Sequence, residues 1–177
     1  MRIIGGKLKS RIFKAPPGKR THPMGEKPRG AIFNALGDLT GMTVLDAYAG
    51  SGALSFEAIS RGASSATALD IDKKAYITLT ENILLLGLEK EVHASRANCS
   101  TWVKNNQDLS YDIVFADPPY YDLNPKHIEE LATAVKSEGL LVISHGAFYR
   151  PNFNEQGWQL LSHKQYANAN ISIYKKP

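Results

Sequence analysis

Short apolar segments alternate with amphipathic segments through the middle of this sequence. The apolar segments have the length of strands, and the segments between them have the spacing of hydrophobic positions that is typical of helices. The predicted strands span residues 43–46, 66–69, 91–94, 111–116 and 140–144, and the predicted helices span 53–61, 73–86, 98–104 and 125–135. This alternation predicts an α/β fold with a mainly parallel sheet that is covered on both faces.

The two ends of the chain depart from this alternation. Residues 28–36 have helical spacing ahead of the first strand, and Pro28 suits the first turn of a helix. The C-terminal segments 158–163 and 171–175 both have the pattern of strands, with no helix between them. We therefore expect a closing hairpin in which one late strand runs antiparallel.

The length of 177 residues fits one domain of ordinary size. The single cysteine, Cys99, excludes an intrachain disulfide, and no cluster of cysteine and histidine has zinc spacing. The N-terminus lacks the apolar segment of a secretory signal, and no apolar run approaches the roughly 18 residues that span a bilayer. We expect a cytoplasmic monomer that holds no metal and does not enter a membrane.

Positive charge is concentrated at the N-terminus. Residues 1–29 hold nine basic residues and one acid, Glu26, so this segment carries +8 and the remaining chain −4. Such a segment is typical of proteins that bind nucleic acid, and it is also what a solvated terminus looks like. Hydrophobic residues interleave with the charges, and Gly5-Gly6 offers a turn. We therefore interpret residues 1–24 as a basic β-hairpin arm on a domain over residues 25–177.

A loop with two glycines, residues 46–52, lies between the first predicted strand and its helix. Glycines let the backbone turn tightly and approach a ligand closely. Asp70 ends the next predicted strand, where an acid can bind both hydroxyls of a ribose. The loop lacks the lysine of a phosphate-binding loop, and Ser55 stands where a dinucleotide fingerprint has its third glycine. Loop and acid predict an adenosine-type cofactor, against the alternative of a helix-capping loop with a surface Asp.

Asp46 narrows the choice of cofactor. An acid at the end of a central strand is costly to bury unless it meets a partner. It would repel the pyrophosphate of NAD, whereas S-adenosylmethionine (SAM) carries a sulfonium and an ammonium. Asp46 therefore favours SAM.

The motif Asp117-Pro118-Pro119-Tyr120 directly follows the fourth predicted strand. The prolines leave two carbonyl acceptors in a stiff loop, Asp117 adds an anionic acceptor, and Tyr120 adds an aromatic face. This set suits a planar group with an amine, whose ring would gain roughly 1–3 kcal/mol by stacking on Tyr120. Acceptors on both amine hydrogens free the nitrogen lone pair for attack on a methyl group. An isolated Asp-Pro-Pro could be a simple turn, but its place after a buried strand favours a catalytic role.

These motifs together resemble the SAM-dependent amino-methyltransferases, whose signature is (Asn/Asp/Ser)-Pro-Pro-(Tyr/Phe/Trp). The closer resemblance is to the RsmD family of bacterial 16S rRNA guanine-N2 methyltransferases. It is carried by residues 1–6, 32–34, 45–54, 57–58, 60–63 and 117–120, and it extends to about residue 145. It implies a Rossmann-like, seven-stranded class I methyltransferase fold, SAM as cofactor, and methylation of one guanine of 16S rRNA, preferably in the assembled 30S subunit.

The resemblance also implies roles for single residues. Asp46, Gly50 and Gly52 would line the methionine end of SAM. Asp70 would bind the ribose, and Asn98 would face the adenine or cap a helix instead. The residues assigned to the cofactor are Asp46, Ala47, Tyr48, Gly50, Gly52, Asp70, Ile71 and Asn98. Those assigned to catalysis are Asp117, Pro118, Pro119 and Tyr120, and those assigned to RNA binding are Arg2, Lys7, Lys9, Arg11, Arg20 and Arg29.

The chain departs from the family pattern at two places near its N-terminus. Residues 20–23 read Arg-Thr-His-Pro where the family has Arg-Pro-Thr, and Arg29-Gly30 replaces Arg-Glu. Because this region is expected to touch the RNA, the target nucleotide stays open. Three alternatives remain: methylation of DNA adenine or cytosine, methylation of protein glutamine, and a non-catalytic RNA-binding role in ribosome assembly. The first usually needs an added DNA-reading domain, and the second favours Asn at position 117.

Overall fold

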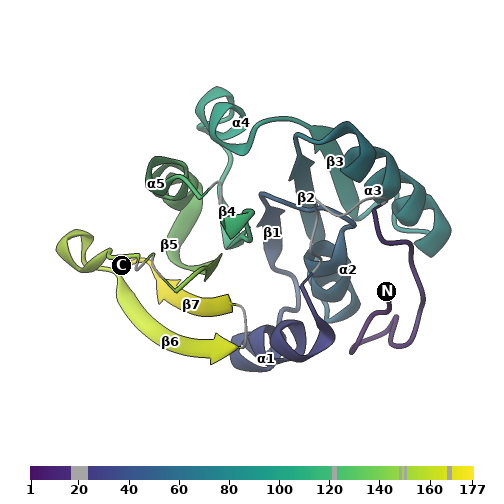
Figure 1. Ribbon diagram of the computed structural model, residues 1–177, viewed down its shortest axis with the longest axis horizontal. Helices are drawn as coiled ribbons and strands as arrows, with labels where there is room; N and C mark the ends of the chain where they lie inside the picture. The colour runs from purple at the N-terminus through teal and green to yellow at the C-terminus, as the bar shows by residue number, and fades with distance from the viewer. Residues whose placement is uncertain (17–23, 121–122, 148, 150, 167–168) are drawn as a thin grey trace.

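A seven-stranded sheet forms the centre of the computed structural model, which describes residues 1–16, 24–120, 123–147, 149, 151–166 and 169–177 (Figure 1). The strand order is β3-β2-β1-β4-β5-β7-β6. The strands are β1 (Thr43–Asp46), β2 (Ser65–Asp70), β3 (Val92–Arg96), β4 (Tyr111–Ala116), β5 (Val135–His145), β6 (Gln159–Tyr166) and β7 (Ala169–Lys175). Strands β1 to β5 pair in parallel, whereas β7 is antiparallel to both β5 and β6. The predicted mixed sheet with a closing hairpin is therefore confirmed.

Helices cover both faces of this sheet. They are α1 (Glu26–Leu36), α2 (Ala53–Ser60), α3 (Lys73–Leu86), α4 (Cys99–Asn105) and α5 (Pro125–Thr133). Alternate residues of β1 and β4 point to opposite faces: Val44 and Phe115 pack with α1, α2 and α3, whereas Leu45 and Val114 pack with α4 and α5. No helix in the described part of the chain is long and apolar enough to cross a membrane.

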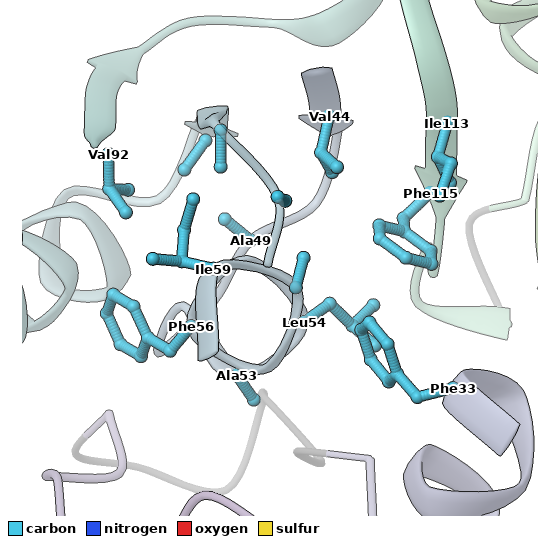
Figure 2. Close-up of a cluster of buried hydrophobic side chains, with 14 of the residues drawn as sticks. Phe33, Val44, Ala49, Ala53, Leu54, Phe56, Ile59, Val92, Ile113 and Phe115 are labelled. Atoms are coloured by element: carbon cyan, nitrogen blue, oxygen red, sulfur yellow. The ribbon is translucent and has the colours of Figure 1, made fainter. Parts of the chain in front are cut away.

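The core on the α2 face contains the phenylalanines that join α1 and the N-terminal segment to the sheet and to α2 (Figure 2). Phe33 from α1 meets Phe115 from β4 with ring centroids 5.6 Å apart, so α1 is tied to the strand that leads into the Asp-Pro-Pro-Tyr motif. Phe56 of α2 packs edge-on against Phe13 of the N-terminal segment at 5.3 Å. Burying each such side chain contributes about 1.5–3 kcal/mol, so these contacts fix the N-terminal residues on the domain.

Several boundaries differ from the sequence prediction, most clearly those of α1, α5 and β5. Helix α1 begins at Glu26, so Pro28 still lies in its first turn. Helix α5 ends at Thr133 rather than residue 135, because Val135 is already paired with Tyr111 of β4 and buried. Glu138 adopts a positive φ of 64°, and the β4–β5 register shifts near it. Strand β5 therefore has an irregular start that apolar periodicity does not reveal.

The N-terminal arm, residues 1–16 in the described chain, forms one antiparallel bridge between Arg2 and Ile12 instead of two regular strands. Backbone hydrogen bonds join Ile3 N to Arg11 O (3.0 Å) and Phe13 N to Met1 O (3.0 Å). Ile3 and Phe13 are buried in the core on the α2 face. The arm therefore lies along the domain beside α2 and α3 (Figure 1).

A buried carboxylate holds the arm to α2. Oε2 of Glu57 accepts the backbone N–H of Ile4 (2.8 Å), and Oε1 accepts that of Gly5 (2.9 Å). The guanidinium of Arg61 also donates to Oε1 at 2.8 Å, and Nε of Arg29 lies 3.8 Å from Oε2. Four partners thus surround one charge that has no contact with water, as a buried ion requires.

Ser60, one turn further along α2, completes the attachment. Its carbonyl accepts the N–H of Lys7 (2.7 Å), and its hydroxyl accepts the N–H of Leu8 (2.9 Å). Gly6 passes so close that a side-chain carbon there would lie 1.8 Å from the Ser60 carbonyl oxygen, and its φ is +75°. A glycine is therefore required at this turn of the arm.

Arg29 is fully buried, with 0% of its surface exposed, and the prediction that it contacts RNA is wrong. Its guanidinium donates to the carbonyl oxygens of Arg2 (2.7 Å) and Met24 (3.1 Å). Burial lowers its pKa, while the nearby Glu57 carboxylate opposes that effect. Arg29 thus joins the arm to the start of α1. The other residue predicted in this region, Arg20, lies outside the described residues.

Replacing Glu57 with Ala should lower the free energy of unfolding by about 3–5 kcal/mol, because the buried guanidinium of Arg29 and the partly buried one of Arg61 would lose their counter-charge. Urea unfolding followed by circular dichroism measures this loss. Glu81→Ala is the matched control, since the Glu81–Lys14 pair links the same arm to α3 on the exposed surface and should matter little. Equal stability of the two variants would contradict the anchoring role of Glu57.

Candidate active site at the centre of the sheet

The ends of β1 and β4 lie side by side where the order of the strands reverses. From β1 the chain proceeds outward through β2 and β3, then returns to place β4 on the other side of β1. Asp46, the last residue of β1, pairs with Phe115, two residues before Asp117. Ligands of open α/β sheets bind at this kind of crevice. The glycine loop and the Asp-Pro-Pro-Tyr motif therefore meet at one place, as their spacing in the sequence predicts.

The glycine loop is held at both sides by the neighbouring strands. Ala47 N donates to Phe115 O (3.0 Å) and Ala49 N donates to Leu69 O (2.8 Å). Both glycines have positive φ, 55° at Gly50 and 91° at Gly52. A side-chain carbon at Gly52 would lie 2.3 Å from the Phe56 ring, whereas one at Gly50 would meet nothing within 4 Å. Packing against Phe56 thus requires a glycine at position 52, whereas Gly50 borders open space.

Asp70 braces this loop. Its Oδ2 accepts the backbone N–H of Gly50 (2.8 Å), and its Oδ1 accepts that of Asp72 (2.8 Å). Burial raises the pKa of Asp70, and the two backbone hydrogen bonds counteract that rise. A carboxylate has about four lone-pair sites, so these bonds leave room for ribose hydroxyls.

The remaining residues assigned to the cofactor surround the same edge. Ile71 follows β2 with 63% of its surface exposed, which is unusual for isoleucine and suits the face of a flat ring. Tyr48 packs partly buried against the core on the α4 face. Asn98 accepts the backbone N–H of Thr101 at 3.0 Å, so its interpretation as a helix cap is confirmed. Its contact with adenine stays a prediction.

Asp46 is a buried acid with only one of its oxygens satisfied. Its Oδ2 accepts the hydroxyl (2.7 Å) and the backbone N–H (3.1 Å) of Ser55. Its Oδ1 has no hydrogen-bond partner among the described residues, and the side chain is 1% exposed. Burial raises the pKa of Asp46 to about 7, helped by the nearby carboxylates of Asp117 and Asp70. A cation at this free oxygen would relieve the desolvation, so the site fits the ammonium end of SAM.

Asp117 and Tyr120 lie on the other side of the same crevice. Asp117 is partly buried, and this burial raises its pKa to about 6. Tyr120 is 40% exposed, and its hydroxyl lies 2.6 Å from the hydroxyl of Ser144 at the end of β5. Pro118 is buried and Pro119 is exposed. A narrow crevice beside Asp117 has mostly apolar walls, and its lining includes Met24, Ile32, Leu54, Asp117 and Ser144.

Two contributors to this site were not predicted from the sequence. Ser55 holds Asp46, although its position in the glycine fingerprint marks it only as a missing glycine. Ser144 holds Tyr120, and the one available signal is a polar residue at the end of the apolar run 140–144. Each of these serines forms a hydrogen bond to a residue of a different structural element.

Strand order, glycine loop and the acid that ends β2 define the class I SAM-dependent methyltransferase fold. The family model described as "conserved hypothetical protein 95" matches residues 1–175. The chain belongs to this family, the RsmD family of methyltransferases.

Individual relatives agree with this membership. The ribosomal RNA small subunit methyltransferase D of Buchnera aphidicola from Acyrthosiphon pisum is 41% identical over 122 residues, which cover 67% of this chain and 62% of that protein. The putative rRNA methyltransferase YlbH of Bacillus subtilis is 30% identical and aligns over 99% of both chains. Among solved structures, the putative methyltransferase yhhF of Escherichia coli has a TM-score of 0.88 at 27% identity, covering 99% of this chain and 97% of its own.

The two loop glycines should respond differently to alanine. Gly52→Ala should lose about 1–3 kcal/mol of stability through overpacking against Phe56. Gly50→Ala should lose only about 1 kcal/mol for its left-handed backbone, yet weaken binding of S-adenosylhomocysteine roughly tenfold by filling the cofactor space. Thermal unfolding and isothermal titration calorimetry measure the two effects. Unchanged affinity in Gly50→Ala would place the cofactor elsewhere.

Proposed function

We propose that this chain transfers a methyl group from SAM to the exocyclic N2 amine of a guanine in 16S rRNA of the small ribosomal subunit. The observation that carries the proposal is the apposition, across β1 and β4, of the half-satisfied Asp46 and the Asp117–Tyr120 pair. The RNA class is supported by relatives named ribosomal RNA small subunit methyltransferase D.

The residues around the glycine loop would hold the cofactor, which supplies an electrophilic methyl group on its sulfonium. The free Oδ1 of Asp46 would accept the ammonium. Open space at Gly50 would admit the cofactor chain, and Asp70 and Ile71 would take the ribose and the adenine face. Because an ammonium favours an ionised carboxyl, binding should deprotonate Asp46.

On the substrate side, Asp117 and the Pro118 carbonyl would accept the two hydrogens of the guanine amine, while Tyr120 would stack on the base. These acceptors draw the nitrogen toward a tetrahedral shape and free its lone pair. The nitrogen then attacks the methyl carbon, and the electrons of the broken carbon–sulfur bond neutralise the sulfonium. The methylated nitrogen loses a proton, which the Asp117 carboxylate can take. Orientation and electrostatics would supply most of the acceleration.

The arm would bind the RNA backbone. Lys7, Lys9 and Arg11 are exposed, and neither lysine has an ion-pair partner within the described ranges. Arg2 is exposed but paired with Glu26, through bonds of 2.9 to 3.1 Å. Such cationic side chains give affinity for phosphates without reading the sequence.

Incubation of undermodified 30S subunits with labelled SAM, followed by nucleoside analysis, tests the proposal. We expect label in N2-methylguanosine, and we expect Asp117→Asn to lower turnover by roughly 10²–10³ while S-adenosylhomocysteine still binds. Label in adenine or cytosine of DNA, or in protein glutamine, would overturn the RNA substrate. Cofactor binding without any transfer to 30S subunits, free rRNA, DNA or protein would favour an assembly role instead.

RNA binding by the arm can be tested separately from methyl transfer. Replacing Lys7 and Lys9 with Ala should weaken RNA binding and flatten the slope of log affinity against log salt by about one unit per lost contact. Filter binding at a series of salt concentrations measures this slope. The matched control replaces Lys90 and Lys164, two exposed lysines on other parts of the surface. A slope that changes equally in both variants would contradict a specific role for the arm.

A further inference from the structure

Ser144 is a buried polar residue one position before the end of β5, and the strand positions directly before it are apolar. It is 2% exposed, and Val142 and Ile143 before it belong to the two hydrophobic cores. Its hydroxyl lies 2.6 Å from the hydroxyl of Tyr120, and Ser144 lines the same crevice as Asp117, whose ionised form it stabilises. One side chain of β5 therefore lies beside both Asp117, which would accept a hydrogen of the substrate amine, and Tyr120, which would stack on the base.

The hydrogens of this group can be placed by counting donors. A serine hydroxyl has one hydrogen, and an ionised carboxylate only accepts. A hydrogen bond from Ser144 to an ionised Asp117 uses that hydrogen, so Tyr120 would then be the donor to Ser144. The resulting chain would run from Tyr120 through Ser144 to Asp117, and this direction suits the ionised form of Asp117.

We infer that Ser144 is a positioning residue for methyl transfer, which joins Asp117 to Tyr120 and keeps both in the arrangement that receives the substrate amine. The inference rests on the proposed function of this site. It assigns Ser144 no contact with the reacting atoms.

The Tyr120 side chain requires a contact that fixes the orientation of its ring. Its ring is 40% exposed, and the backbone of Gly146 approaches it, since a side-chain carbon there would lie 3.6 Å from Cβ of Tyr120. The hydroxyl bond to Ser144 sets the direction in which the ring extends from the loop. Small misplacements of a binding group far from the chemistry can cost large factors in rate.

Ser144 also favours the ionised form of the Asp117 carboxyl. The groups that face it are Asp46 from β1, Tyr120 from its own loop and Ser144 from β5. Apolar walls come from Met24 just before α1, Ile32 of α1 and Leu54 of α2. Burial raises the pKa of Asp117 to about 6, and the hydrogen bond from Ser144 opposes this rise. Because that bond stabilises the ionised form, its loss should raise the pKa of Asp117 further.

The test compares Ser144→Ala with the wild type in two measurements. In the first, ¹³C NMR follows the titration of the Asp117 carboxyl carbon, assigned with Asp117→Asn, in protein without substrate. In the second, kcat for methyl transfer is measured against pH. An ionised Asp117 is the active form, so activity should be lost as pH falls through its pKa. We expect wild-type activity to fall below about pH 6.

In Ser144→Ala, the midpoint of the NMR titration should move to higher pH by about one unit. The acid limb, which is the loss of kcat at low pH, should move by the same amount. On the plateau above the limb, kcat should fall on the order of tenfold, while KM for RNA changes less. Ser144→Thr, which keeps the hydroxyl, should restore the position of the limb.

Ser172→Ala is the matched control. Ser172 is equally buried on the neighbouring β7, but its hydroxyl bonds His145 and His163 at 3.0 Å each rather than Asp117. This variant should leave the titration of Asp117 and the acid limb where they are in the wild type. A shift as large as that of Ser144→Ala would show a general effect of the substitution and overturn the inference.

A titration of Asp117 unchanged in folded Ser144→Ala would also overturn it. If Ser144→Ala does not fold, Tyr120→Phe removes the other end of the chain at a partly exposed position, and wild-type kcat in that variant would contradict the positioning role. The NMR titration needs no substrate. An enzyme inactive on 30S subunits therefore overturns the proposed function without deciding the role of Ser144.

Discussion

The charge of Glu57 is the constraint on which the substrate side of this molecule depends. A carboxylate without access to water must collect partners, and those available are the backbone of the arm and two guanidinium groups. Ser55, half a turn earlier on the same helix, holds Asp46. Helix α2 thus fixes the arm at one place and the cofactor side at another. The short, fully buried helix leaves little freedom between them.

Three acidic side chains lie close together at the carboxyl edge of the sheet, and burial disfavours their ionised forms. A bound cation would stabilise these ionised forms. Burial raises the pKa of Asp46, Asp70 and Asp117, and Asp46 feels the other two. Dipoles from Ser55, Gly50 and Ser144 offset part of this cost. On the proposed function, a sulfonium cofactor with an ammonium group would supply the missing positive charge at Asp46, and Asp117 would be left to accept hydrogens from an amine. The same edge would then match the charge of the cofactor and the polarity of the substrate.

The fold could be predicted from the sequence because each strand and helix is encoded locally. Parallel pairing then brings residues that follow β1 and β4 together without further information. Arg29 was misassigned for the opposite reason: its partners, Glu57 and the carbonyl of Arg2, are distant in the chain, and a count of charges cannot separate a buried arginine from a surface one. The role of Ser144 could not be predicted for the same reason, since its partner Tyr120 lies in the loop after another strand, 24 residues away in the chain.

Arg29 also gives the arm a fixed relation to the site. Its guanidinium bonds the carbonyl of Arg2 in the arm and that of Met24, which lines the crevice beside Asp117. At the neighbouring residue of the arm, the sulfur of Met1 lies 3.3 Å from the Ser51 hydroxyl of the glycine loop. On the proposed function, phosphates held by the arm would therefore lie at a set distance from the amine acceptors. Because phosphate contacts position RNA without reading it, the choice of one guanine would depend on whether the folded RNA can span that distance.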